Sequence, residues 1–342
     1  MADRLLEVKD LKVQFATEDG TVQAVDGVSF TLEPGKVLGI VGESGSGKSV
    51  TAMTVMGLTQ GVNARIEGEV NYKGTNLLDV SDRDMQAYRG KEIGMIFQDP
   101  MTSLNPVYRI GEQIVEAIRV HDPIDKRAAR DRAIELLHQV GIPNPGARVD
   151  DFPHQFSGGM RQRAMIAMAL AGNPSILIAD EPTTALDVTI QAQIIELIAR
   201  LKDELQSAVI FITHDLGVIA EIADEVLVMY AGRVVEQGTK RDIFYDPQMP
   251  YTWGLLGSIP RLDRPRVERL HTIKGAPPSL INAPDGCRFR PRCPYAFDKC
   301  GAEPALENRV EQPGHLDRCW LTVAEKGQHG AETLAGLARE AL

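Results

Sequence analysis

Short apolar runs alternate with amphipathic stretches over much of the chain. Residues 37–41, 176–179 and 209–212 are apolar runs of strand length. Between the last two, residues 188–206 carry apolar side chains at helical spacing, namely Ile190, Ile194, Leu197, Ile198, Leu201 and Leu205. Buried strands that alternate with amphipathic helices predict an α/β fold with a parallel sheet.

Two other regions have their own patterns. Residues 5–15 and 22–32 are strand-like and are separated by Glu18-Asp19-Gly20, which predicts an antiparallel sheet ahead of the α/β core. From about residue 100 to 172 the pattern is helical, with one apolar stripe at Ile110, Ile114, Val115 and Ile118 and another at Ala133, Leu136, Leu137 and Val140. A Pro-rich tract, residues 247–291, indicates a further boundary.

Composition narrows the class of protein. With 342 residues, the chain is long enough for one large core and a smaller module. Its 37 basic and 47 acidic residues give a net charge of −10, which does not favour nucleic acid as a partner. The first residues lack the apolar segment of a secretory signal, and no run approaches the ~20 apolar residues that span a bilayer. We therefore expect a cytosolic chain that reaches a membrane only through other chains.

A phosphate-binding loop follows the first apolar run. The sequence G-x-x-x-x-G-K-[ST] is matched at every fixed position, in a strand–loop–helix context, by Gly42, Glu43, Ser44, Gly45, Ser46, Gly47, Lys48 and Ser49, and Val50 begins the helix-compatible stretch. The glycines turn backbone N–H groups toward phosphates, and the helix N-terminus adds partial positive charge. Lys48 is expected to reach the β- and γ-phosphates and Ser49 to bind Mg²⁺. The chain is therefore expected to bind a nucleoside triphosphate.

Two carboxylates end the strand at residues 176–179. Asp180 is expected to hold Mg²⁺ through water at the carboxyl edge of the sheet, and Glu181 to orient and polarise the attacking water. The alternative is a strand that ends in solvated acids.

A second candidate anion site lies at Ser157-Gly158-Gly159. These residues precede the helical run 160–171, so free N–H groups, a hydroxyl and a helix N-terminus come together. Taken alone, the segment has a simple N-cap after a turn as its alternative.

In this order, these segments resemble the motifs of ATP-binding cassette (ABC) proteins. The resemblance implies a RecA-like α/β core with an antiparallel β subdomain and a helical subdomain. It makes Gln98 the Q-loop glutamine that touches Mg²⁺, Ala185-Leu186-Asp187 the D-loop and His214 the histidine that contacts the γ-phosphate. Phe15 resembles the aromatic residue that stacks on adenine, although it also fits a core strand. In this family ATP lies between the P-loop of one subunit and the signature motif of another, so Ser157, Gly158, Gly159, Gln162 and Asp187 would contact ATP in trans.

Residues 98–106, 181–193, 247–252 and 287–294 are similar to the ATPases of dipeptide and oligopeptide importers, most of all to their D-type subunit. This resemblance implies an ATPase at the cytoplasmic face of the inner membrane. Its partners would be two transmembrane permease subunits, a second and homologous ABC ATPase, and a peptide-binding protein that acts through the permeases. Other possibilities are a soluble ABC ATPase outside transport, or nickel, haem or glutathione as cargo. The expected domains are a nucleotide-binding domain at 1–245, its helical subdomain at about 100–172, an importer-type extension at 246–326 and a tail at 327–342.

All four cysteines, Cys287, Cys293, Cys300 and Cys319, lie in this extension. The reducing cytosol disfavours disulfides, and their spacing alone does not separate a zinc site from an iron–sulfur cluster or from free thiols. The set resembles that of importer ATPases with a [4Fe-4S] cluster, so we expect a cluster, with Zn²⁺ as the alternative. Arg288, Arg290, Arg292 and Arg318 are expected to offset the thiolate charge, in a module remote from the P-loop.

Overall fold

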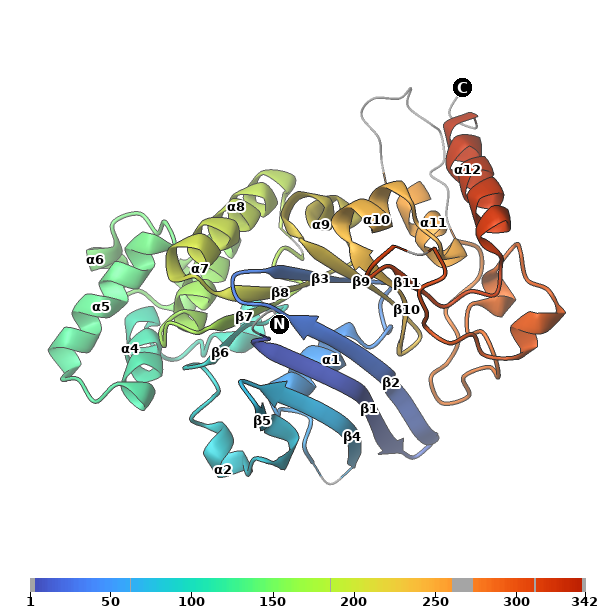
Figure 1. Cartoon of the computed structure of the whole chain (residues 1–342). Coiled ribbons are helices and arrows are strands. Elements are labelled where there is room, and N and C mark those ends of the chain that lie inside the picture. Colours follow the sequence, from blue (N-terminus) through green and yellow to red (C-terminus); the bar gives the residue numbers. More distant parts are fainter. Residues whose placement is uncertain (1–3, 62, 185, 260–272, 311, 340–342) are drawn as a thin grey trace. The chain divides into compact units, whose positions relative to one another are not determined.

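Figure 1 shows the computed structural model of the chain, which describes residues 4–61, 63–184, 186–259, 273–310 and 312–339. The chain folds into two compact units that are interleaved along the sequence. Unit 1 contains the residues up to Leu6, then Leu32–Val37 and Tyr72–Ile212. Unit 2 contains Glu7–Thr31, Leu38–Asn71 and the residues from Thr213 onward.

Unit 1 is built on parallel strands. Strands β6 (Ile93–Ile96), β7 (Ile176–Asp180) and β8 (Ala208–Thr213) lie in the order β8-β7-β6. Every residue of these strands is buried, which explains why their sequences are continuous apolar runs. Helix α8 (Val188–Leu205) makes the crossover from β7 to β8.

The helical part of unit 1 lies between β6 and β7. It contains α3 (Pro100–Ser103), α4 (Ile110–His121), α5 (Lys126–Gln139), α6 (Pro145–Arg148), the 3₁₀ turn Pro153–Gln155 and α7 (Gly158–Ala169), drawn in green in Figure 1. Helices α4, α5 and α7 pack on one another, with Ile110, Ile114 and Ile118 fully buried. Shorter elements of unit 1 are β5 (Thr75–Asn76), the 3₁₀ turn Leu77–Asp79 and α2 (Asp82–Met85).

Unit 2 contains strands from both sheets of the chain. In one sheet, β3 (Val37–Val41) is parallel to its neighbour β9 (Glu225–Tyr230). Strand β10 (Arg233–Thr239) is antiparallel to β9, and β11 (Leu316–Asp317), the edge strand, is antiparallel to β10. In the other, the order is β2 (Gly20–Leu32), β1 (Leu6–Thr17), β4 (Ala64–Tyr72). Strands β1 and β2 are neighbours joined by a two-residue turn at Glu18-Asp19, as in a hairpin.

The helices of unit 2 flank these strands and extend to the C-terminus. They are α1 (Lys48–Val55), α9 (Leu216–Ile222), α10 (Lys240–Tyr245), α11 (Pro250–Gly257), the 3₁₀ turns Arg290–Arg292 and Asp298–Gly301, and α12 (Val323–Arg339). Helix α12 packs on α11 (Figure 1). Residues 327–339, which the sequence predicts to be a tail, belong to this helix. Within the described residues, no helix is both long and apolar enough to cross a membrane. Part of the Pro-rich tract, residues 260–272, lies outside the described residues, and the boundary at 245/246 stays a prediction.

Candidate nucleotide site

The P-loop connects the buried strand β3 to helix α1, as predicted. Gly42 has a φ of 152° and Gly47 a φ of 100°, a region that favours glycine. A Cβ atom at Gly42 would lie 2.1 Å from the carbonyl oxygen of Met229, and one at Gly47 would lie 2.4 Å from that of Ala24. The loop therefore packs directly on the backbone of β9 and β2, and no larger residue fits at either end.

The Lys48 ammonium lies inside this loop. Its side chain is buried, and Nζ donates hydrogen bonds to the carbonyl oxygens of Gly42 (2.8 Å) and Glu43 (3.0 Å). A fixed positive charge thus lies at the N-terminus of α1, where the helix dipole adds to it. Ser49 and Val50, the next residues of α1, are partly exposed. Phosphate oxygens are the ligands that this arrangement accepts best.

Glu43 is held by side chains that the sequence analysis missed. Its carboxylate forms a bidentate ion pair with Arg292, at 2.5 and 3.0 Å, and its backbone N–H donates to Tyr251 Oη at 2.9 Å. The prediction that the cysteine-bearing module is remote from the P-loop is therefore wrong, because Arg292 lies one residue before Cys293. No sequence motif indicates this contact, since 249 positions separate the two partners.

In unit 1, β7 brings two predicted site residues to its end, the Mg²⁺ ligand Asp180 and the catalytic Glu181. Asp180 is 2% exposed, and Glu181 follows it with its carboxylate near Gln98. Gln98 Nε2 donates to Glu181 Oε2 at 3.1 Å, and Thr184 Oγ1 donates to the same oxygen at 2.9 Å. The structure thus brings Gln98 and Glu181 together, and Thr184 is a partner that the sequence analysis did not name.

The backbone of Glu181 is strained. Its φ is 46°, a value that a glutamate rarely adopts. The conformation is held by hydrogen bonds from its N–H to the carbonyl of Ile212 (2.9 Å) and from the N–H of Thr184 to its carbonyl (3.2 Å). Strained residues of this kind occur at catalytic positions, where the surrounding structure fixes one orientation of the side chain.

The predicted signature motif caps helix α7. Ser157 Oγ accepts a hydrogen bond from the N–H of Met160 at 3.3 Å, and Ser157 and Gly158 are exposed. Gly159 packs close to Ile190, because a Cβ atom there would lie 3.0 Å from Ile190 Cγ2. The first residue of α7 and its cap are exposed, as an anion site at a helix N-terminus requires.

Two further members of the predicted in-trans set lie in different environments. Gln162 is only 2% exposed, so we leave it out of the proposed ATP contacts. Asp187 caps α8, with Oδ1 accepting from the N–H of Ile190 at 3.0 Å, and stays exposed. Ala185 of the D-loop lies outside the described residues.

Phe15 and His214 belong to unit 2, together with the P-loop. Phe15 lies on β1 and is partly exposed, so it is not a core residue. His214 follows β8 directly and is exposed, ahead of α9. The residues predicted to bind phosphate thus lie in unit 2, and the carboxylates and the predicted signature motif lie in unit 1.

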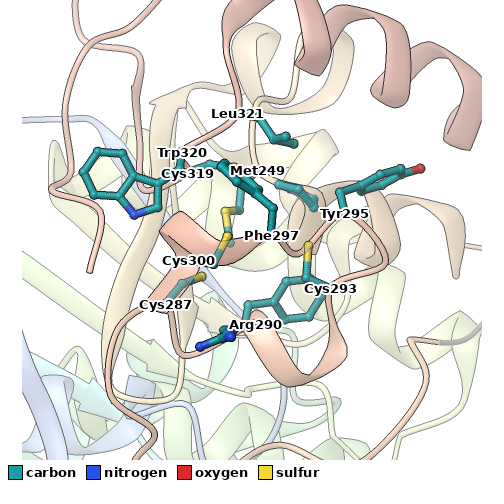
Figure 2. A pocket seen from close by; sticks show the side chains of 12 residues that line it. Met249, Cys287, Arg290, Cys293, Tyr295, Phe297, Cys300, Cys319, Trp320 and Leu321 are labelled. Atoms are coloured by element: carbon teal, nitrogen blue, oxygen red, sulfur yellow. The ribbon is translucent and has the colours of Figure 1, made fainter. Parts of the chain in front are cut away.

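The four cysteines converge on one small pocket, shown in Figure 2. Cys287 and Cys293 flank the turn Arg290–Arg292, Cys300 lies in the turn Asp298–Gly301, and Cys319 follows β11. The N–H of Cys287 donates to the carbonyl of Cys300 at 3.0 Å, which joins the two turns. All four are free thiols, and the cavity between them is about 10 Å³, room for roughly one water molecule.

The thiols affect one another electrostatically. Burial, strengthened by the other thiols, raises the pKa of Cys293 to about 12, and burial raises that of Cys319 to about 12 as well. The prediction that the arginines offset thiolate charge is wrong for two of them, since Arg288 pairs with Asp26 at 2.5 Å and Arg292 with Glu43. Among the described residues, no group of three or more His, Cys, Asp or Glu side chains has the arrangement of a metal site.

Comparison with known proteins identifies the family. The chain is 58% identical to the oligopeptide transport ATP-binding protein OppD of Bacillus subtilis over 295 residues, 86% of this chain and 82% of that protein. It is 53% identical to OppD of Salmonella typhimurium over 95% of this chain and 96% of that protein. The chain belongs to the family of ATP-binding subunits of oligopeptide and dipeptide ABC transporters.

Two family models and one solved structure agree with this membership. Residues 25–184 match the ABC transporter family, and residues 235–300 match the C-terminal region of oligopeptide and dipeptide transporters. A dimeric ATP-binding cassette, in a post-hydrolysis state with bound ADP and phosphate, matches with a TM-score of 0.62 and 28% identity, over 69% of this chain and 99% of that chain. The sequence predictions of an ABC cassette fold and an ATPase are confirmed, and so is the resemblance to peptide importers.

Replacing Lys48 by alanine removes the charge at the centre of the P-loop. We expect Lys48→Ala to weaken ATP binding by at least about tenfold, because a charge-assisted hydrogen bond to phosphate is lost. Titration of the purified chain with a fluorescent ATP analogue measures the change. Lys91→Ala, an exposed lysine on the surface of unit 1, is the control and should bind as the parent does. Undiminished affinity of Lys48→Ala would refute the nucleotide assignment of this loop.

Replacing Glu181 by glutamine keeps the shape of the side chain and removes its charge. We expect Glu181→Gln in the assembled transporter to bind ATP normally and to hydrolyse it about 100-fold more slowly, because an amide polarises water poorly. Phosphate release and bound nucleotide are measured on the same preparation. The matched change at an exposed glutamate of α8, Glu196→Gln, should leave both unchanged. Hydrolysis at the parent rate in Glu181→Gln would assign the role to another group.

Proposed function

We propose that this chain is one of two ATPase subunits that energise the import of di- or oligopeptides from the cytoplasmic face of the inner membrane. The observation that carries the proposal is the similarity to OppD of Salmonella typhimurium over 95% of this chain, since that protein is named for oligopeptide transport. The remaining partners would be two permease subunits, a homologous ATPase subunit and a peptide-binding protein that delivers cargo to the permeases.

ATP would lie between the two ATPase subunits, with Mg²⁺ held by one of them. On this proposal Lys48 and the N–H groups of the P-loop bind the β- and γ-phosphates, while Ser49, Gln98 and Asp180 hold Mg²⁺. Glu181 orients the attacking water, and His214 contacts the γ-phosphate. The exposed Ser157 and Gly158 of the facing subunit complete the site, which the uncovered N-terminus of α7 supports.

An exposed apolar surface in unit 1 supports the proposal that this chain contacts the permease subunits. Beside Gln98 in unit 1, the side chains of Phe97 (36%), Met101 (57%), Val107 (73%) and Tyr108 (54%) are exposed. Apolar groups concentrated in one short segment, 97–108, are typical of a surface that another protein covers. Closure of the ATPase pair would move this segment, and the permeases would change access in response.

The permease contact predicts how hydrolysis responds to partners. The isolated chain should hydrolyse ATP slowly, and adding permeases and the second ATPase subunit should raise the rate steeply. Val107→Asp should reduce this stimulation at least about tenfold, because a charge is then buried at the interface. Val120→Asp, at a residue of α4 that is 67% exposed, is the matched control and should leave stimulation intact. A monomer with high, concentration-independent activity would contradict the proposal.

We further propose that the four thiols hold a [4Fe-4S] cluster in the C-terminal extension, with Zn²⁺ as the alternative. Cysteine thiolates are ligands of both groups, and the four cysteines line one pocket: two flank the turn Arg290–Arg292, one lies in the turn Asp298–Gly301 and one follows β11. Since Cys293 and Cys319 have pKa values near 12, loading would release protons from them at neutral pH. The bound group would join the turns around Cys287, Cys293 and Cys300 to β11, as expected for a small module.

The cluster proposal predicts the metal content of the chain. Anaerobically purified protein should be brown, absorb broadly near ~400 nm and contain about four irons per chain. Cys293→Ser and Cys319→Ser should lose the iron and the colour. Stoichiometric zinc without iron or acid-labile sulfide, in protein never exposed to air, would reject the cluster in favour of a zinc site.

A further inference from the structure

The P-loop of this chain contains an acidic residue next to its first glycine. Glu43 is the first variable position of the loop, and its side chain is 27% exposed. An unpaired carboxylate there would repel the phosphates of ATP, because like charges at short range in a partly buried site interact strongly. The residues around Glu43 therefore decide whether the loop attracts or repels a triphosphate.

Arg292 neutralises this carboxylate with a well-defined geometry. Its Nη1 and Nη2 atoms donate to the two oxygens of Glu43 at 2.5 and 3.0 Å, and the Arg292 side chain is 4% exposed. The guanidinium is also fixed by the backbone, since Nε donates to the carbonyl of Lys274 at 3.0 Å and Nη2 to that of Ile273 at 3.3 Å. Bidentate arginine–carboxylate pairs of this kind are both strong and directional.

The turn that contains Arg292 also contributes residues to the lining of the cysteine pocket. The N–H of Arg290 donates to the carbonyl of Cys287 and the N–H of Arg292 to that of Phe289, each at 2.9 Å, and Cys293 follows directly. Phe289 lines the cysteine pocket and packs against Tyr230 and Tyr251, with ring centroids 5.3 and 5.4 Å apart. The position of Arg292 thus depends on the folding of this turn.

The same aromatic group holds the backbone of the P-loop. Tyr251 is fully buried, and its Oη accepts the N–H of Glu43 at 2.9 Å. The carbonyl of Glu43 in turn accepts a hydrogen bond from Lys48 Nζ at 3.0 Å. Glu43 is therefore fixed at its side chain, its N–H and its carbonyl, two of these from the C-terminal part of the chain.

We propose that Arg292 is a positioning residue of the nucleotide site, which neutralises Glu43 and holds the P-loop, so that ATP affinity depends on the turn between Cys287 and Cys293. This proposal rests on the proposed role of the P-loop in binding ATP, and it holds whichever group the cysteines bind.

The proposal is tested by comparing single variants at Glu43 and Arg292 with the double variant, all in the 342-residue chain. The probe is a fluorescent ATP analogue, whose Kd is measured for each variant. Arg292→Met should raise the Kd for the analogue about tenfold, because Glu43 is left charged and unpaired beside the phosphates. Adding Glu43→Gln to Arg292→Met should return the Kd to within about threefold of the parent, since the repelling charge is gone. Arg292→Lys keeps the charge and loses the bidentate geometry, so its Kd should lie between those of the parent and Arg292→Met.

Arg290→Met is the matched control, an exposed arginine of the same turn, and should bind as the parent does. In the assembled transporter, Arg292→Met should raise the KM for ATP with little change in kcat at saturating ATP. A Kd for Arg292→Met equal to that of Arg290→Met would overturn the proposal. So would a double variant as weak as the single one, which would indicate general loosening of the turn.

Two further measurements keep the proposal testable if Arg292→Met does not fold. Glu43→Gln alone should bind the analogue at least as tightly as the parent, because Arg292 stays in place, and a tenfold loss would contradict the proposal. The parent and Lys48→Ala separate the two hypotheses. If the parent binds no analogue, the nucleotide assignment itself fails. If both behave as expected and Arg292→Met binds normally, only the role of Arg292 fails.

Discussion

Close packing of the P-loop against its neighbouring strands is the constraint on which the proposed nucleotide site depends. The P-loop achieves it only because glycine stands at Gly42 and Gly47, where the carbonyls of Met229 and Ala24 leave no room for a side chain. Strands β2, β3 and β9 thus supply the surface that shapes the loop. The ion pair of Glu43 with Arg292 adds a contact from the C-terminal module, so the loop is fixed from both ends of the sequence.

The residues proposed for hydrolysis belong to the other unit. The strained backbone of Glu181, together with its hydrogen bonds to Gln98 and Thr184, fixes the direction of one carboxylate. Gln98 also begins the segment whose apolar side chains are exposed for a partner. One short stretch of unit 1 therefore connects the proposed catalytic base to the proposed permease surface. This is the connection that an ATPase needs to convert hydrolysis into movement of another chain.

Local pattern predicted the strands and helices of the α/β core well. The runs at 37–41, 176–179 and 209–212 became β3, β7 and β8 because strands buried on both faces need continuous apolar sequence. The burial of Gln162 and the pairing of Arg292 with Glu43 could not be predicted, since both depend on tertiary packing. The four cysteines were grouped by sequence alone, and the structure adds that they share one pocket.

Peptide uptake into reconstituted liposomes tests the central claim most directly. The chain is combined with the proposed permeases and second ATPase subunit, and ATP is supplied on the side of the ATPases. A labelled oligopeptide with the proposed binding protein is supplied on the other side. The account predicts accumulation of the peptide against its gradient, coupled to ATP hydrolysis and strongly reduced when Glu181→Gln replaces the parent chain. ATP hydrolysis at the full rate without peptide accumulation, or accumulation that does not depend on ATP, would contradict it.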